Sequence, residues 1–237
     1  MDPARIDVAI LCGGKGTRLQ SVVPDRPKPL AEVAGTPFLE HLIRWAAGQG
    51  FRRFILCAGY MAEQIDVFAK KMARDGLSVE CLTEPNPLGT GGALRFAADR
   101  MSSDPVLVLN GDSFCDVDLA KFLDFFSAKR CLAALVLAPA PAGEARFGTV
   151  EADASGEIRS FQEKAPGPGA GRINAGVYLI GHDPITGMPG AAPFSLEKEL
   201  FPSLIGNGLF GMRSEGRFID IGVPEDYRRA QEMFRSA

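Results

Sequence analysis

The stretch VAILCGGKGTRL, residues 8–19, decides the fold, because an apolar segment runs directly into a glycine-rich loop that carries two cations. Residues 8–12 have the length and apolar content of a strand buried in a sheet. Glycines after such a strand let the backbone approach a nucleotide, and Arg18 supplies planar donors for phosphate oxygens. The loop lacks the GK[ST] ending of a Walker A motif and the spacing of GxGxxG. It indicates a nucleotide-binding loop of another kind, with a plain turn between strand and helix as the alternative.

Outward from this stretch, short apolar segments alternate with longer amphipathic ones. We expect strands at residues 8–12, 54–58, 77–82, 105–109, 131–138 and 173–180. We expect helices at residues 37–47, 61–73, 91–100, 118–127, 195–201 and 224–234. This βαβα order predicts an α/β fold with a mostly parallel central sheet that is covered on both faces, and with ligands outside the carboxyl ends of the strands.

The pattern changes after the first half of the chain. Residues 147–164 (FGTVEADASGEIRSFQEK) alternate apolar and polar residues around Ser155-Gly156, which predicts a β-hairpin. The Pro/Gly-rich residues 165–172 predict a loop. We therefore expect one domain over residues 1–237, with a first half at 1–140 and a smaller, β-rich lobe within 141–237.

The composition of this 237-residue chain excludes several classes of protein. A formal net charge of −3 argues against a protein that coats nucleic acid. The N-terminus lacks the apolar region of a secretory signal, and no apolar stretch approaches the roughly eighteen residues of a membrane span, so we expect a cytoplasmic protein without membrane association. The five cysteines are odd in number and form no CxxC, which indicates buried thiols instead of disulfides or a zinc site.

Two further loops suit phosphate or nucleotide binding. PKP, residues 27–29, places Lys28 between two prolines, which predicts an extended segment that presents the ammonium group. EPNPLGTGGA, residues 84–93, supplies glycines that could line a base or a ribose, although a flexible turn explains them equally well.

Two aspartates stand in positions that suit a metal ion. LNGDSF, residues 109–114, puts Asp112 directly after an apolar strand, where α/β phosphoryl-transfer sites hold magnesium; a turn is the alternative. FIDIGVPEDY, residues 218–227, places Asp220 between two isoleucines, where an unpaired carboxylate is costly to bury, so we expect a metal or a cationic partner. His41 and His182 belong to no recognisable nucleophile and base arrangement.

Together these five segments resemble the sugar nucleotidyltransferase family, whose motifs GGxGTRL, PKP, PLGTGG, NGD and DIGxPEDY occur here in that order over nearly the whole chain. The resemblance implies a Rossmann-like three-layer fold, with a nucleotide-binding half at 1–140 and a sugar-phosphate-binding half at 141–237. It also implies that a sugar 1-phosphate attacks the α-phosphorus of an NTP and releases pyrophosphate. Mg²⁺ would be bound by Asp112 and Asp220, and the catalytic residues would be Arg18, Lys28 and Asp112.

The resemblance further implies two sets of binding residues. Those expected at the nucleotide are Leu11, Gly13, Gly14, Gly16, Thr17, Arg18, Lys28, Glu84, Pro87, Gly89, Thr90 and Asp112. Those expected at the sugar phosphate are Gly148, Glu163, Lys164, Asn174 and Gly176. The implied partners are an NTP and a sugar 1-phosphate, with a homodimer as an option and without nucleic acid.

Within the family, residues 16–42 most closely resemble the heptose-1-phosphate guanylyltransferases, which make nucleotide sugars for lipopolysaccharide or capsule. Mannose-1-phosphate guanylyltransferases and N-acetylmuramate-1-phosphate uridylyltransferases are the alternatives. Glu84 favours GTP, because a carboxylate can accept from both N1–H and the 2-amino group of guanine, whereas the oxygens of uracil would be repelled. A catalytically silent regulatory subunit should lack a motif residue, yet Arg18, Lys28, Asp112, Lys164 and Asp220 are all present. An NAD-dependent oxidoreductase should carry GxGxxG, which this loop lacks.

Overall fold

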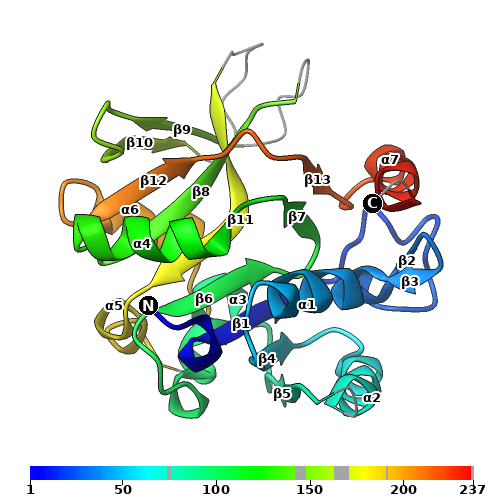
Figure 1. Ribbon diagram of the computed structural model, residues 1–237. Coiled ribbons are helices and arrows are strands. Elements are labelled where there is room, and N and C mark those ends of the chain that lie inside the picture. Colours follow the sequence, from blue (N-terminus) through cyan, green and yellow to red (C-terminus); the bar gives the residue numbers. More distant parts are fainter. Residues whose placement is uncertain (74–75, 142–147, 163–170, 191, 236–237) are drawn as a thin grey trace.

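A computed structural model describes residues 1–73, 76–141, 148–162, 171–190 and 192–235, and a nine-stranded mixed sheet lies at its centre (Figure 1). The parallel half of the sheet consists, in spatial order, of β5 (Ser78–Thr83), β4 (Arg53–Ala58), β1 (Asp7–Cys12) and β6 (Val106–Asn110). The helices between these strands are α1 (Phe38–Gly48), α2 (Ala62–Met72), α3 (Gly89–Phe96) and the short η4 (Ala98–Arg100). Because β1 pairs with β4 on one edge and β6 on the other, the chain reverses its direction of progress across the sheet at β1, and a crevice opens there.

The other half of the sheet is largely antiparallel. Its strands are β8 (Ala133–Pro139), β9 (Thr149–Ala152), β10 (Ile158–Gln162), β11 (Arg172–Ile180) and β12 (Leu209–Arg213). β11 joins the two halves, because it pairs antiparallel with β6, β8 and β9. β9 and β10 form the hairpin that the sequence predicts, so the expected α/β class with an added β-rich part is confirmed.

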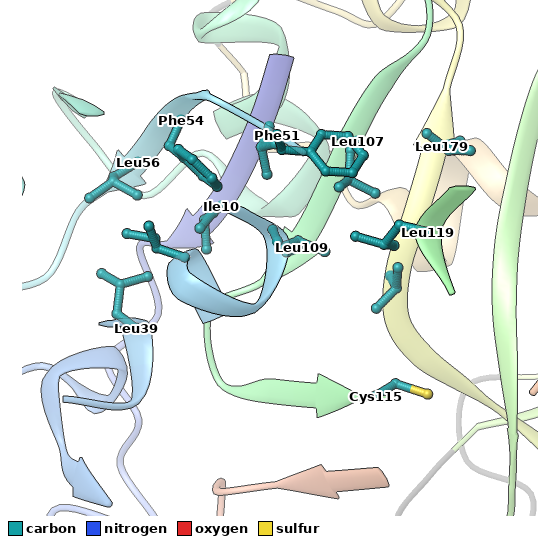
Figure 2. Close-up of a cluster of buried hydrophobic side chains, with 14 of the residues drawn as sticks. Ile10, Leu39, Phe51, Phe54, Leu56, Leu107, Leu109, Cys115, Leu119 and Leu179 are labelled. Carbon is teal, nitrogen blue, oxygen red and sulfur yellow. The ribbon is translucent and has the colours of Figure 1, made fainter. Parts of the chain in front are cut away.

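Helices cover both faces of the sheet and divide the core in two. Alternate residues of β1 show this division: Val8 and Ile10 pack with α1, α2 and α4 (Leu119–Lys129), whereas Ala9 packs with α3 on the opposite face. Figure 2 shows the first cluster, in which Ile10, Phe54 and Leu109 come from three neighbouring strands. The second face is also covered by α5 (His182–Thr186), the π-helical η5 (Leu196–Leu200) and α6 (Phe201–Leu204). None of the described helices is long and apolar enough to cross a membrane.

A separate two-stranded ladder carries two of the expected site residues. β7 (Ser113–Cys115) follows β6 and pairs antiparallel with β13 (Phe218–Asp220), so that Asp220 lies opposite Ser113. The amide of Ile221 donates to the carbonyl oxygen of Asp112 at 2.9 Å. The ladder therefore joins the end of β6 to a segment near the C-terminal end of the described chain. α7 (Pro224–Arg235) contacts β13 and also β2 (Glu32–Val33), which pairs with β3 (Thr36–Pro37).

Two of the expected segments have another local structure, and the strands β2, β3, β7 and β12 and the helix α5 were not expected. Lys28 does not lie in an extended segment, because Lys28–Leu30 forms a 3-10 turn, η2, in which the amide of Ala31 donates to the carbonyl oxygen of Lys28 at 3.0 Å. Pro29 is compatible with this turn, since the first residues of a short helix have no acceptor for an N–H. The helix expected at 195–201 is π-helical at Leu196–Leu200 before α6 begins. At the N-terminus, η1 (Pro3–Arg5) precedes β1.

The five cysteines are free thiols, as their number and spacing predict. Cys81 is half-buried and the other four are buried. Burial raises the pKa of Cys57 and of Cys131 to about 12, so both thiols stay protonated at neutral pH.

A buried ion pair fixes the beginning of β1. Asp7 is 3% exposed, and its Oδ1 accepts from Nη1 of Arg53 in β4 at 2.5 Å. Its Oδ2 accepts from the amides of Ser102 and Ser103 at 2.6 and 3.0 Å. Burial alone would raise the pKa of Asp7, but these donors outweigh it, so the pKa lies below its ordinary value. One carboxylate therefore ties β1 to β4 and to the turn that leads into β6.

We predict that Asp7→Asn lowers the free energy of unfolding by about 2–3 kcal/mol at pH 7, because hydrogen bonds to a buried charge are strong and one donor loses its acceptor. Since the folded pKa lies below the unfolded one, this stabilisation is complete above the unfolded pKa and is lost as pH falls through the folded pKa. Urea unfolding between pH 7 and pH 3 should show the difference between wild type and variant narrowing towards low pH.

The matched control is Asp66→Asn, which removes an exposed pair with Lys70 and should change stability little. Equal stability of Asp7→Asn and wild type at pH 7 would contradict the role assigned to Asp7.

Candidate functional site

A cavity of about 600 Å³ lies outside the carboxyl ends of β1, β4, β5 and β6. Each of these strands contributes the loop that follows it, as expected for a parallel sheet. The lining residues are Leu11, Gly13, Gly14, Lys15, Gly59, Tyr60, Glu84, Pro85, Asn86, Pro87, Gly89, Thr90, Ala93, Asn110 and Asp112. The volume suits a nucleotide, since sites for small molecules measure roughly 300–1,000 Å³.

The structure gathers most of the residues expected at the nucleotide around this cavity. Those that line it are Leu11, Gly13, Gly14, Glu84, Pro87, Gly89, Thr90 and Asp112. Gly16, Thr17, Arg18 and Lys28 are absent from its lining. Sequence reasoning missed Gly59 and Tyr60, which directly follow the strand expected at 54–58. The signal that identified Gly13, a glycine immediately after a buried parallel strand, would also have found Gly59.

Glu84 follows β5 and extends towards the first glycine-rich loop. Its Oε2 accepts from the amide of Leu88 at 2.8 Å. Its Oε1 lies so near the backbone of Gly13 and Gly59 that a Cβ on these residues would come within 2.1 and 2.5 Å of it. Burial raises the pKa of Glu84, and the Leu88 amide offsets part of that rise. The carboxylate can therefore occupy this position only because residues 13 and 59 lack a Cβ.

Three charged groups converge beside the cavity. Lys28 donates to Oδ2 of Asp112, whose Oδ1 accepts from the hydroxyl of Ser113 at 3.2 Å. A Cβ built on Gly222 would lie 2.6 Å from Oδ1 of Asp220 and 3.5 Å from Nζ of Lys28, so the ammonium group and the second carboxylate share one small space. Burial alone would lower the pKa of Lys28, but Asp112 and Asp220 outweigh it and raise the pKa. Lys28 therefore stays protonated between two acidic groups.

Asp112 and Asp220 fit a hard divalent cation that is shared with a bound phosphate. Mg²⁺ is commonly bound by one or two carboxylates together with substrate phosphates, instead of by a cage of protein ligands alone. Within the described ranges, no group of three or more His, Cys, Asp or Glu side chains could hold a metal ion. The ammonium group of Lys28 already stands beside both carboxylates, which shows that this place favours positive charge. The donor set suits a metal whose coordination is completed by a nucleotide.

The glycines of the PLGTGG motif have two kinds of surroundings: one lines the cavity, and the others pack against another segment of the protein. Gly89 and Thr90 line the cavity. The amides of Gly91 and Gly92 instead donate to the carbonyl oxygen of Phe194 at 2.8 and 3.1 Å. A Cβ on Gly91 would lie 2.6 Å from the Phe194 ring. Gly91 and Gly92 therefore allow the segment around Phe194 to approach α3 closely, and they do not line the cavity.

The structure describes three of the five residues that the resemblance places at the sugar phosphate. Glu163 and Lys164 lie outside the described residues. Gly148 precedes β9 and does not line the cavity. Asn174 and Gly176 lie in β11, where the amide of Gly176 donates to Oδ1 of Asn174 at 3.0 Å. Gly176, with φ of +72°, packs against the side chain of Asn110, so this part of β11 borders the cavity wall.

The arrangement suits group transfer by positioning and charge neutralisation. A carboxylate and glycine backbone face one part of the cavity, and acidic and cationic groups cluster at another. His41 and His182 do not line the cavity, and Nε2 of His41 bonds to the carbonyl of Val33 at 2.8 Å. The cavity lining therefore offers no histidine as a base for covalent catalysis.

Comparison with known sequences finds one family model and relatives whose names agree with that family. The family model for nucleotidyl transferases matches residues 8–235. The mannose-1-phosphate guanylyltransferase of Mycobacterium tuberculosis is 35% identical over 95% of this chain, which spans only 63% of that relative's length. The D-glycero-α-D-manno-heptose 1-phosphate guanylyltransferase of Aneurinibacillus thermoaerophilus is 35% identical over 96% of this chain and 97% of its own length.

A solved structure resembles this one over nearly its full length. HddC from Yersinia pseudotuberculosis, complexed with GMP-PN, superposes with a TM-score of 0.85 and 35% identity, and the match covers 97% of this chain and 99% of HddC. Sequence motifs, fold and relatives agree, and the chain belongs to the nucleotidyl transferase family.

Proposed function

We propose that this protein transfers GMP from GTP to a sugar 1-phosphate and releases pyrophosphate, with D-glycero-α-D-manno-heptose 1-phosphate as the preferred acceptor. The observation that carries the base assignment is the Glu84 carboxylate, held by Leu88 in the cavity wall against Gly13 and Gly59. The relative that this chain matches from end to end, a heptose 1-phosphate guanylyltransferase, supports the acceptor. Mannose 1-phosphate is the second candidate, because a mannose-1-phosphate guanylyltransferase is equally similar in sequence.

The guanine base would present two donors on one edge, N1–H and the 2-amino group. A carboxylate oxygen has two lone pairs, so Oε2 of Glu84 can accept from Leu88 and still face a ligand. Because Glu84 is half-buried, a wrong base that brings acceptor oxygens to it would leave buried polar groups unpaired.

The phosphates of GTP would lie towards Lys28, Arg18 and the two aspartates. We propose that Asp112 and Asp220 bind Mg²⁺ together with phosphate oxygens, where the ion supplies neutralisation of phosphate charge. Lys28 would then exchange its bond with Asp112 for one with the triphosphate, and Arg18 offers planar donors to the same oxygens. Gly16, whose Cβ position lies 3.0 Å from Cβ of Lys28, leaves room for the lysine stem.

The reaction would be a direct displacement. An anionic oxygen of the sugar 1-phosphate forms the new bond to the α-phosphorus as the bond from the α-phosphorus to the β-phosphate oxygen breaks, and pyrophosphate leaves with that electron pair. The attacking oxygen is already deprotonated, so no protein base is required. Asn174, Gly176, Gly148, Glu163 and Lys164 are the proposed contacts of the sugar phosphate.

Two further proposals concern the setting of the reaction. The five free thiols support a reducing, cytoplasmic location. The homodimer that the family resemblance allows is a proposal that light scattering of the purified protein tests.

We predict that GTP exceeds UTP by about tenfold to a hundredfold in kcat/KM, since a well-formed bidentate contact to a base edge contributes roughly 1–3 kcal/mol. Glu84→Gln should erode this preference, because one acceptor becomes a donor that opposes the guanine donors. Pyrophosphate release from four NTPs against several sugar 1-phosphates measures both the base and the acceptor.

The control for this prediction is Glu80→Gln, in β5 but absent from the cavity lining, which should keep the preference for GTP. Gly59→Ala should behave as Glu84→Gln does, because its Cβ would displace the carboxylate. If wild type uses UTP or dTTP faster than GTP with every sugar, the base assignment is wrong while family membership stands.

We also predict that Lys28→Met raises the affinity of the nucleotide-free protein for Mn²⁺ about tenfold or more, measured by the EPR signal of free Mn²⁺. Lys28 neutralises the carboxylates that would bind the metal, and a unit charge near 4 Å is worth ~1 kcal/mol in water and ~4 kcal/mol at an effective dielectric of 20. Asp112→Asn should lower the affinity. Unchanged Mn²⁺ binding in both variants would show that these aspartates do not hold the metal.

A further inference from the structure

A segment far along the chain, residues 192–200, bonds to the glycine-rich loop at the beginning of α3, and we call this segment the clamp. Residues 192–200 cross the start of this helix, and the amide of Phe194 donates to the carbonyl oxygen of Leu88 at 2.9 Å. In return, the carbonyl oxygen of Phe194 accepts from Gly91 and Gly92. This segment therefore supplies an acceptor for two amides near the beginning of the helix, where acceptors within the helix are lacking.

Glu197 lies in this clamp and holds Thr90, a residue that lines the cavity. The hydroxyl of Thr90 donates to Oε2 of Glu197 at 2.7 Å and accepts from the amide of Leu196 at 2.9 Å. Ser195 also donates to Oε2 of Glu197, at 3.0 Å. The one hydroxyl proton of Thr90 is thus committed to the carboxylate, which fixes the side chain at the cavity wall.

The other oxygen of Glu197 faces Tyr178 of β11. The Tyr178 side chain is fully buried, and its hydroxyl lies 3.5 Å from Oε1 of Glu197. Nδ2 of Asn174 donates to this hydroxyl oxygen at 2.9 Å, and Nδ2 of Asn110 does so at 3.3 Å. One carboxylate therefore reaches the glycine loop on one side and two asparagines on the other.

The polarity of this network is fixed by the backbone. The amide of Gly176 donates to Oδ1 of Asn174, so Nδ2 of that side chain must point to Tyr178. The Tyr178 hydroxyl oxygen then accepts hydrogen bonds from the asparagine NH₂ groups, and the hydroxyl hydrogen is directed to Glu197. A neutral Gln at position 197 could accept from Thr90 only by turning its NH₂ group towards a hydroxyl oxygen that already accepts from two amides.

Glu197 lies in a π-helix, Leu196–Leu200, a rare geometry that frequently occurs at functional sites. Ser195 caps this helix by accepting from the amide of Lys198 at 3.1 Å. No residue of this helix lines the cavity, so Glu197 acts on the site through its neighbours.

We propose that Glu197 is a positioning residue that fixes Thr90 in the cavity wall and, through Tyr178, fixes both Asn110 at another part of that wall and Asn174, a proposed contact of the sugar phosphate, so that both substrates are aligned by one carboxylate. This inference rests on the proposed function. In-line transfer requires the attacking oxygen and the α-phosphorus to be aligned at roughly 3–3.5 Å, and a displacement of about 1 Å can cost a hundredfold in rate. A single anion that is bonded to Thr90 and faces the Tyr178 hydroxyl connects the two walls and provides that alignment.

The central test is Glu197→Gln, with Glu199→Gln as its matched control. Glu199 lies in the same π-helix and is exposed, and within the described part of the chain its Oε2 accepts a hydrogen bond only from the amide of Ser195. We expect Glu197→Gln to lower kcat tenfold to a hundredfold with the NTP and sugar phosphate that wild type prefers, while the Kd for that NTP alone changes less than about threefold. Glu199→Gln should leave kcat within about twofold of wild type.

Connection through Glu197 is tested by Thr90→Val and Tyr178→Phe. In the wild-type background each should lower kcat, and in the Glu197→Gln background each should have little further effect, because the shared partner is already lost. If the two substitutions cost the same factor in both backgrounds, or if Glu197→Gln lowers Tm without lowering kcat, the proposal is wrong.

A readout independent of turnover separates this inference from the proposed function. Hydrogen exchange should become faster in both residues 84–93 and residues 173–180 of Glu197→Gln, and in neither segment of Glu199→Gln. Faster exchange in only one segment would show that Glu197 does not connect the two walls. If wild type turns over no pair of NTP and sugar phosphate, the proposed function is wrong. The hydrogen-exchange result would still decide whether Glu197 connects residues 84–93 with residues 173–180.

Discussion

The parallel pairing of β1 with β4 on one edge and with β6 on the other is the constraint on which the rest of the structure depends. It places β1 in the interior of the sheet, where all of its residues except the partly exposed Leu11 are buried. The chain first adds β4 and β5 on one side of β1 and then adds β6 on the other side. The loops after β1 and β6 therefore separate and leave a cavity, while the loops after β4 and β5 form its side. Asp7, bonded to β4 and to the turn before β6, fixes this pairing at the opposite end of the strand.

Close approach between segments explains several glycines that a motif alone would assign to a ligand. Gly13 and Gly59 leave room for the Glu84 carboxylate, and Gly91 and Gly92 leave room for the segment around Phe194. Gly111 has a similar cause, because a Cβ there would lie 2.7 Å from the carbonyl oxygen of Leu11. Substitutions at these positions would act on the site by moving protein groups, even where no ligand touches the residue.

The charged side chains of the site contact one another at the place that we propose for the nucleotide phosphates. Lys28 stands beside Asp112 and Asp220, so the cluster is partly neutralised before any nucleotide arrives. A triphosphate brings enough negative charge to attract both the ammonium group and a divalent cation. The geometry thus links proposed nucleotide binding to a rearrangement of Lys28, and Glu197 offers a second link between the walls of the cavity.

The sequence by itself determined most strands of the central sheet, without β12, most of the helices that cover it and the β-hairpin around Ser155, because apolar periodicity and strand-to-loop junctions are local properties. The family resemblance, which short motifs of adjacent residues carry, indicated many of the loop residues that line the cavity. Only the tertiary structure decided which distant residues meet: Asp220 beside Asp112 through the β7–β13 ladder, and Glu197 beside Thr90 and Tyr178. It also decided that Lys28 lies in a 3-10 turn and that the Glu84 carboxylate lies against the backbone of Gly59. Apart from the turn at Lys28, whose hydrogen bonds are local, these features arise from contacts between segments far apart in the chain, and no local pattern of residues encodes such contacts.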